Sequence, residues 1–284
     1  MTDGLARLEQ ASGRDRPGWA VGAACILEAS APKPGNVHPE AEFPDLAHAD
    51  LVAAAVAIAP VFDRARGTPL GRTIHAAVAA SVRVTRSNAN LGIVLAIAPL
   101  AAAAAATPEA VAAVLGGLGP ADAADVWEAI ALARPGGMGT SGRHDLRSPP
   151  PAELRAAMAE AAGRDQIARL WTTDFAGLFA GPVADLDAEL AAGHRLDEAI
   201  VRIHLRQLAR APDTLIARRH GAAAAAAVSV RAAEVLAAGG AWREAAADFD
   251  RSLRTPRRVN PGTTADIVAA ALYILLREQR LALP

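Results

Sequence analysis

Cysteine and aromatic residues are both scarce in this sequence. Cys25 is the single cysteine among 284 residues, which excludes an intramolecular disulfide framework and any zinc or iron–sulfur site built from several cysteines. Aromatic residues make up only 4% of a chain that is 52% hydrophobic, so the apolar content is mainly alanine, leucine and valine. Strands favour β-branched and aromatic residues, and this composition therefore argues against a β-sandwich or barrel.

A large net charge and a long hydrophobic run are also missing. The formal net charge is -1, so no basic field predicts binding to nucleic acid or to an anionic membrane. The most apolar run, residues 91–106, contains Pro99 and is shorter than the roughly 20 residues that span a bilayer. The first residues include acidic side chains and no apolar core after a basic start, unlike a secretory signal. We expect a cytoplasmic protein with no membrane partner.

Helical periodicity recurs along almost the whole chain, and no stretch alternates as a strand does. A loop rich in proline and glycine is expected at residues 136–151, a flexible N-terminus at 1–17, and Thr107 is expected to cap a helix. The pattern predicts one all-α globular domain over residues 1–284. Its helices are expected at residues 19–29, 51–65, 74–84, 91–106, 108–115, 121–133, 152–162, 165–180, 183–191, 196–211, 213–238 with a break near Gly221, 242–253 and 264–281.

Lysine and asparagine are rare in this sequence, and their positions are informative. The only lysine is Lys33, and asparagine occurs at positions 36, 88, 90 and 260. All of them lie in three short segments that read as loops, residues 31–38, 87–92 and 260–266. Asparagine is a common turn residue, but a lone lysine in a chain that otherwise uses arginine requires a specific reason. We therefore expect these three segments to carry any chemistry.

The first segment combines a carboxylate, a lysine and a tight turn. Glu28 lies at a predicted helix end, and Lys33 precedes a Pro-Gly-Asn turn that contains Gly35 and Asn36. Exposed backbone N–H groups in such a turn can hold a phosphate, with the lysine as a point charge. The alternative is a helix stop followed by a rigid turn, without a ligand.

The other two segments precede predicted helices. Asn88 and Asn90 offer donors and acceptors to a nucleotide, or serve only as a helix cap. Residues 263–266 match a capping box. A helix N-terminus that carries the hydroxyls of Thr263 and Thr264 is also a ready anion site. Asp266 is then either a partner in the cap or a magnesium ligand.

Carboxylates near these segments fit Mg²⁺, which binds through few protein carboxylates together with substrate phosphates. Asp45 and Asp266 are the candidate ligands, and Glu28 is a third nearby carboxylate. No His-x-x-x-His or His-Glu-x-x-His pair is present.

The order and spacing of four motifs resemble the triphosphoribosyl-dephospho-CoA synthase family. They are Glu28 with residues 32–35, Asp45 with Leu46, residues 88–92, and residues 261–266, so that the resemblance extends from about Ala20 to Leu276. The resemblance implies an all-α fold and a reaction in which a ribose hydroxyl of 3′-dephospho-CoA attacks C1′ of ATP. Adenine leaves, and the triphosphate stays attached to the ribose.

The resemblance also suggests roles for single residues. Glu28 and Asp45 are expected at the reacting ribose, and Asp45 and Asp266 at Mg²⁺. The remaining candidates are expected to bind phosphates or to position the nucleotide: Lys33, Gly35, Asn36, Asn88, Asn90, Arg219, Gly262, Thr263 and Thr264. Arg218, beside Arg219, is a further candidate for phosphate, although both arginines also fit a solvated helix surface.

Two motifs depart from the family pattern. Typical members read His-x-Asp-Met at residues 43–46 and Asn-Thr-His-Lys-Gly at residues 88–92, so this chain lacks two histidines and one lysine there. The acceptor can therefore differ, and a related phosphoribosyl transfer in the assembly of a pterin one-carbon cofactor is an alternative. A non-catalytic nucleotide-binding helical protein is another. Alanine-rich helix faces also allow a homodimer.

Overall fold

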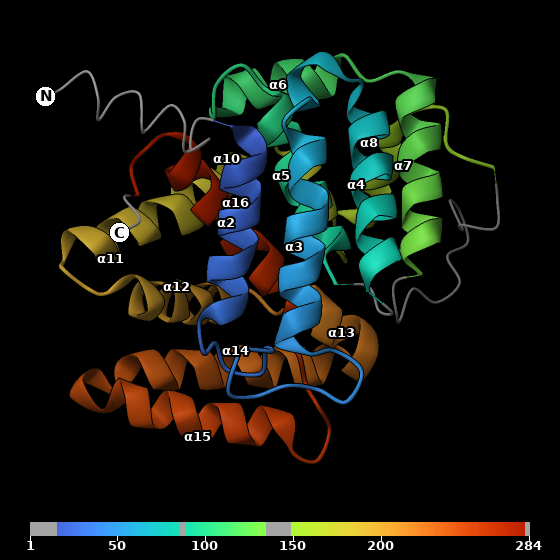
Figure 1. Ribbon diagram of the computed structural model, residues 1–284. Helices are drawn as coiled ribbons and strands as arrows, with labels where there is room; N and C mark the ends of the chain where they lie inside the picture. Colours follow the sequence, from blue (N-terminus) through green and yellow to red (C-terminus); the bar gives the residue numbers. More distant parts are fainter. Residues whose placement is uncertain (1–15, 86–88, 135–148, 282–284) are drawn as a thin grey trace, which may run out of the picture.

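The computed structural model describes residues 16–85, 89–134 and 149–281, and those residues are helical with no strand among them. The all-α prediction is thus confirmed for this part of the chain. The predicted flexible N-terminus at 1–17 lies almost wholly outside the described residues, as does most of the predicted loop at 136–151. Figure 1 shows α2 and α3 side by side at the front of the molecule, with α4 and α7 beside them.

The helices follow one another with short connections. In the first half they are α2 (Pro17–Ser30), α3 (His48–Phe62), η1 (Ala65–Gly67), α4 (Leu70–Val84), α5 (Leu91–Ala102), α6 (Pro108–Gly116) and α7 (Pro120–Ala133). In the second half they are α8 (Leu154–Ala161), α9 (Gln166–Thr172), α10 (Ala176–Leu178), the π-helical turn η2 (Phe179–Val183), α11 (Ala184–Ala191), α12 (Leu196–Arg210), α13 (Thr214–His220), α14 (Ala222–Ala237), η3 (Gly239–Ala241), α15 (Trp242–Arg254) and α16 (Gly262–Arg277).

Two helices are apolar on every side and form the centre of the core. Residues 267–276 of α16 are buried throughout, and α5 is buried from Ile93 to Ala101. A helix that is hydrophobic all round must be covered on all faces. The covering is provided by contacts of α16 with α2, α5 and α12, and of α5 with α4. These two buried helices fix the positions of the residues at their N-terminal ends.

Most predicted helices are confirmed, including the N-cap of Thr107, whose hydroxyl accepts the N–H of Ala110 at 3.2 Å, and the break at Gly221 with φ +89°. The helix predicted at 91–106 ends earlier, at Ala102. The guanidinium of Arg277 donates to the carbonyls of Leu100, Ala103 and Ala104, and so takes up the free acceptors of this helix end.

The helix predicted over residues 165–180 is wrong as a single element. The chain turns at Asp174 and Phe175, which have φ of +48° and +62°, and only then enters α10. The ring of Phe175 is fully buried. The turn interrupts the helix and places the ring of Phe175 in the core. The periodicity of apolar residues alone does not reveal such an interruption.

The stretch between α2 and α3 is a compact loop. Two isolated antiparallel bridges, His38 with Ala41 and Phe43 with Leu46, hold it together. Among the described residues no single helix is both long and apolar enough to cross a membrane. Among the described residues, α14 and residues 239–254 together have the length and composition of a membrane span, but they are bent by 117° at their junction.

Candidate active site

The segments with the rare lysine and asparagines meet in space. The amide of Asn36 donates to Oδ1 of Asn260 at 2.7 Å. Gly35 has φ +80°, and a Cβ there would lie 2.8 Å from the carbonyl oxygen of Val259 and from Cδ of Pro261. The first and third segments therefore interlock at a position that only glycine allows.

The second segment reaches the same place through α5. Asn90 precedes the first residue of this helix, and Gly92 lies against the carboxylate of Asp266, where a Cβ would stand 1.9 Å from Oδ2. Residues far apart in the sequence are thereby assembled at the N-terminal ends of the two central helices. Asn88 lies outside the described residues.

Lys33 is fully buried and is bound to Glu28. Its Nζ lies 2.9 Å from Oε1 of Glu28 and donates to the carbonyls of Glu28 and Ala31, the latter at 3.3 Å. These three acceptors match the three protons of an ammonium group. This geometry favours a role for Lys33 in positioning the carboxylate of Glu28 over the direct phosphate contact that the sequence suggests.

A histidine that the sequence analysis did not identify stands behind Lys33. His204 of α12 is fully buried, and among the described residues neither ring nitrogen has a hydrogen bond of normal geometry. Burial lowers the pKa of His204 well below its ordinary value, and the charge of Lys33 lowers it further, while the carbonyl of Pro34 opposes the shift. No local motif around His204 marks it, because the neighbours that matter come from another segment.

Asp266 lies in the second turn of α16 and is partly accessible. Burial of its carboxyl raises the pKa of Asp266 well above the usual value. The negative charges of Glu28, Asp213 and Asp165 act in the same direction, and Arg218 opposes them. Glu28 and Asp266 are thus two carboxylates whose charges repel each other within one site.

The expected capping box at residues 263–266 is wrong. The N–H of Thr264 donates to Oδ2 of Asp213 at 2.7 Å, and its hydroxyl donates to the same oxygen at 2.8 Å. Oδ1 of Asp213 accepts the N–H groups of Leu215 and Ile216, each at 2.9 Å, and so caps α13. One buried carboxylate therefore caps two helices, and burial raises the pKa of Asp213 although these bonds oppose the shift.

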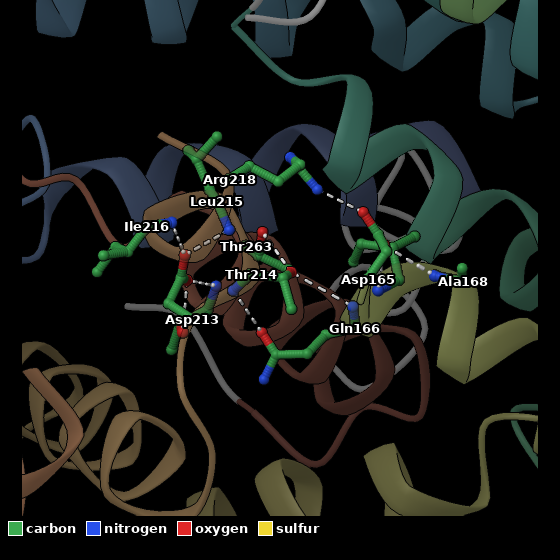
Figure 2. A network of polar contacts seen from close by, with 11 residues as sticks. Asp165, Gln166, Ala168, Asp213, Thr214, Leu215, Ile216, Arg218 and Thr263 are labelled. Atoms are coloured by element: carbon green, nitrogen blue, oxygen red, sulfur yellow. Dashed lines mark hydrogen bonds and ion pairs between the residues drawn. The ribbon is translucent and has the colours of Figure 1, made fainter. Parts of the chain in front are cut away.

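The remaining polar groups continue this network (Figure 2). The hydroxyl of Thr214 lies 3.2 Å from that of Thr263 and accepts the N–H of Gln166 at 3.3 Å. Asp165 caps α9 and pairs with Arg218 at 2.5 Å. The hydroxyls of Thr263 and Thr264 are thus bound within the protein, and the anion at the N-terminus of α16 is Asp213. Gly262, also expected at a phosphate, packs against the side chain of Leu215.

Besides the ring nitrogens of His204, three more polar atoms of this region are buried and have no partner among the described residues. They are Oδ1 of Asn36, Nδ2 of Asn90 and Nε of Arg218. Native proteins leave few buried polar atoms unpaired, and such atoms mark a place for a ligand, an ion or a water. The sequence predicts that Asn36 and Asn90 position a nucleotide. In the structure each side-chain amide keeps one buried atom that can still form a hydrogen bond.

Asp45 and Arg219 lie at the surface. Asp45 has a side-chain exposure of 71% and pairs with Arg258. That hydrogen bond, followed by the charges of Arg258 and Arg219, lowers the pKa of Asp45. The guanidinium groups of Arg258 and Arg254 lie 4.7 and 5.6 Å from the ring centre of Phe43.

The part of the chain that the structure describes contains no large cluster of metal-binding side chains. No group of three or more histidine, cysteine, aspartate or glutamate side chains there is placed to hold an ion. Glu28 and Asp266 still offer hard oxygen donors, and a divalent cation relieves the repulsion between two carboxylates. A magnesium ion that arrives with a nucleotide is compatible with this pair.

Four residues of the candidate site are absent from the sequence-based prediction: Asp165, His204, Asp213 and Thr214. Asp165 and Asp213 each stand directly before a helix, a pattern that predicts only an ordinary N-cap. Each caps its helix with Oδ1, and Oδ2 reaches a partner far away in the sequence. That second bond depends on the tertiary fold and has no local signature.

Comparison with known proteins identifies a matching family from the sequence and a similar fold from the structure. The profile of the ATP:dephospho-CoA triphosphoribosyl transferase family matches residues 14–283. No curated protein sequence gives a significant match. A crystal structure from Archaeoglobus fulgidus, provisionally assigned as a triphosphoribosyl-dephospho-CoA synthase, aligns with a TM-score of 0.62 and 22% identity, covering 80% of this chain and 98% of that one. Because the family profile spans nearly the whole sequence, the chain belongs to the ATP:dephospho-CoA triphosphoribosyl transferase family.

Proposed function

We propose that the protein transfers the triphosphoribosyl group of ATP to 3′-dephospho-CoA. An oxygen–C1′ bond forms between a ribose hydroxyl of the acceptor and the ribose of ATP, and the C1′–N9 bond to adenine breaks. The acceptor hydroxyl gives up one proton and the departing adenine takes up one proton, so adenine leaves as the neutral base and atoms and charge balance. The observation that carries the proposal is the convergence of Glu28 and Asp266 with the unsatisfied amides of Asn36 and Asn90.

Glu28 is suited to stabilise the transition state. Breaking a glycosidic bond develops positive charge at C1′ and the ring oxygen, and a fixed carboxylate lowers the energy of that charge. The ammonium of Lys33 lies 2.9 Å from Oε1 of Glu28 and pairs with this carboxylate in a buried position. We assign Glu28 to the reacting ribose and Lys33 to the positioning of Glu28.

Asp266 and Glu28 are the carboxylates that would hold Mg²⁺, which supplies charge neutralisation of the triphosphate when bound. Asp266 is partly accessible, whereas Glu28 is nearly buried. Their oxygens match the preference of Mg²⁺, which retains several waters and substrate phosphates as its other ligands.

The unpaired amides are suited to hold the nucleotide. Oδ1 of Asn36 can accept a hydrogen bond and Nδ2 of Asn90 can donate one, and both atoms are buried without a partner among the residues that the structure describes. Hydroxyls of a ribose and the edge of adenine offer the complementary groups. Both substrates are intracellular nucleotides, and Cys25 is a free thiol, so we expect the enzyme to act in the cytoplasm.

Release of adenine tests this function. Purified protein with ATP and Mg²⁺ is assayed with and without dephospho-CoA, together with Glu28→Gln and a control variant, Arg195→Gln. Arg195 is an exposed arginine paired with Asp197 at the start of α12. We expect adenine release that requires dephospho-CoA and falls by about 10²- to 10³-fold in Glu28→Gln, with the control unchanged.

Two results would contradict the proposal. Adenine release that does not respond to dephospho-CoA, or no release despite ATP binding, rejects this acceptor and directs the search to pterin-type acceptors. Full activity in Glu28→Gln rejects the assignment of Glu28.

A further inference from the structure

A group of charged and aromatic side chains at the edge of the candidate site has no role in the reaction described so far. We name it the Phe43 patch, and it consists of Phe43, Asp45, Arg219, Arg254 and Arg258. Its residues come from the loop between α2 and α3, from α13, and from α15 with the segment that follows it.

The three arginines of the patch differ in how firmly they are held. Arg254 pairs with Asp250 at 2.7 Å and donates to the carbonyl of Asn36, and it is mostly buried. Arg258 is about half exposed, and its bond to a protein carboxylate is the ion pair with Asp45. Arg219 is exposed, and its charge also acts on Asp45.

The charges of the patch do not balance. Asp250 neutralises Arg254, whereas Arg219 and Arg258 share the single carboxylate of Asp45. An excess positive charge is thus left at a place that is accessible to solvent. Asp45 itself is 71% exposed, and exposed ion pairs contribute little to stability, so a stronger anion can displace its carboxylate.

The patch is continuous with the candidate active site through two connections. Arg218 and Arg219 are neighbours in the last turn of α13. The guanidinium of Arg218 pairs with Asp165 in the polar network of the candidate active site, whereas Arg219 belongs to the Phe43 patch. Arg254 donates to the carbonyl of Asn36, whose amide group binds Asn260. The patch is thus joined to the candidate active site by residues that are adjacent in the sequence or bonded to one another.

We propose that Arg219 and Arg258 form a subsite for the polyphosphate chain of a substrate, and that the carboxylate of Asp45 takes the place of a phosphate until the substrate binds. Guanidinium groups bind phosphate oxygens through paired N–H donors. Phe43 supports Arg258 from one side, with 4.7 Å between the guanidinium carbon and the ring centre. This inference rests on the proposed function and gives Asp45 a different role from the catalytic and metal-binding ones that its motif suggests.

Binding of inorganic tripolyphosphate tests the subsite without any turnover. Calorimetric titration of the full-length protein is compared with Arg258→Gln, Arg219→Gln, Asp45→Asn and the control Arg195→Gln. We expect each of the first two variants to weaken binding by about tenfold. Asp45→Asn is expected to tighten binding severalfold, because the competing carboxylate is removed, and the control is expected to bind as the wild type does.

Three results overturn the subsite. They are absence of tripolyphosphate binding at millimolar concentration, wild-type affinity in both Arg219→Gln and Arg258→Gln, and weaker binding in Asp45→Asn. All these positions are exposed or half exposed, so the variants are expected to fold, and their circular dichroism spectra are checked against the wild type.

Steady-state kinetics identifies which substrate contributes the phosphates. A raised KM for ATP in Arg258→Gln assigns the triphosphate of ATP to the subsite, and a raised KM for dephospho-CoA assigns the diphosphate of the acceptor. Unchanged KM values for both, or a loss of kcat without a change in KM in Asp45→Asn, contradict the inference. If the wild type shows no turnover with dephospho-CoA, the proposed reaction is rejected, and the tripolyphosphate titration still decides whether the subsite exists.

Discussion

At the scale of single residues, the one lysine of the sequence supplies a fully buried positive charge. Lys33 is fully buried, and its ammonium is bound to the carboxylate and carbonyl of Glu28 and to the carbonyl of Ala31. The composition correctly marks Lys33 as a residue with a special reason to be present. It does not distinguish a lysine that contacts substrate from one that positions a neighbouring carboxylate, since both require a lone cation near Glu28.

Replacement of Lys33 separates these two roles. In Lys33→Met, Glu28 is left as an unpaired buried carboxylate, and we expect the free energy of unfolding to fall by about 3–5 kcal/mol. Urea denaturation measures the loss. The double variant Glu28→Gln/Lys33→Met is expected to recover part of it, because the uncompensated charge is then absent. Wild-type stability in Lys33→Met would instead favour a lysine that acts only on substrate.

Acidification tests the burial of His204. Burial and the charge of Lys33 hold the pKa of His204 well below its ordinary value in the folded state, so the unfolded chain binds a proton that the folded one does not. The stability that depends on neutral His204 is therefore fully present above the pKa of this histidine in the unfolded chain. It is lost as the pH falls below that pKa. We expect the free energy of unfolding of the wild type to fall more than that of His204→Leu as the pH is lowered from about 6.5 to about 5.

Thermal unfolding of both proteins across this pH range provides the measurement. Parallel losses of stability in the wild type and in His204→Leu would show that His204 does not titrate on unfolding. Other acidic and basic groups are common to both proteins, so the difference between the two curves isolates the histidine.

At the scale of helices, Asp213 links α13 to α16. Its two oxygens accept hydrogen bonds from the start of each helix, so the position of the N-terminal turn of α16 depends on one side chain of α13. In Asp213→Asn, Oδ1 can still cap α13, but the amide nitrogen faces the N–H of Thr264, which is also a donor. We expect a loss of stability of about 1–3 kcal/mol from this unsatisfied N–H.

Asp165→Asn is the matched control for this prediction. It also removes the charge of an N-cap aspartate, but the bond of its Oδ2 is to Arg218, where both side chains are about a quarter exposed. Chemical denaturation is expected to show a smaller loss of stability in Asp165→Asn than in Asp213→Asn. Equal stability of Asp213→Asn and the wild type would contradict the linkage of the two helices.

The sequence predicts the positions of several helices well. It predicts helix ends and interruptions less well where tertiary contacts determine them. Proline, glycine and helical spacing predict α2, α4, α6, α7 and α12 to within a few residues. They miss the turn at Asp174 and Phe175 and the early end of α5, because a buried ring and the guanidinium of Arg277 determine those positions.

At the scale of the whole molecule, residues from four distant segments form one site. The two central helices, α5 and α16, bring Gly92 against Asp266, and the loop after α2 interlocks with the segment before α16 through Gly35 and Asn36. Three rare-residue segments predict this assembly from the sequence. The network of Asp165, Asp213 and Thr214 was not predictable, because its bonds join residues about fifty positions apart.

The mass of the product tests the central claim most directly, namely that this site transfers an intact triphosphoribosyl group. Wild-type protein is incubated with ATP, Mg²⁺ and dephospho-CoA, and the products are resolved by liquid chromatography and mass spectrometry. We predict one molecule of free adenine for each molecule of acceptor that gains a ribose with all three phosphates. Release of pyrophosphate or ADP, or an acceptor of unchanged mass, would contradict the account.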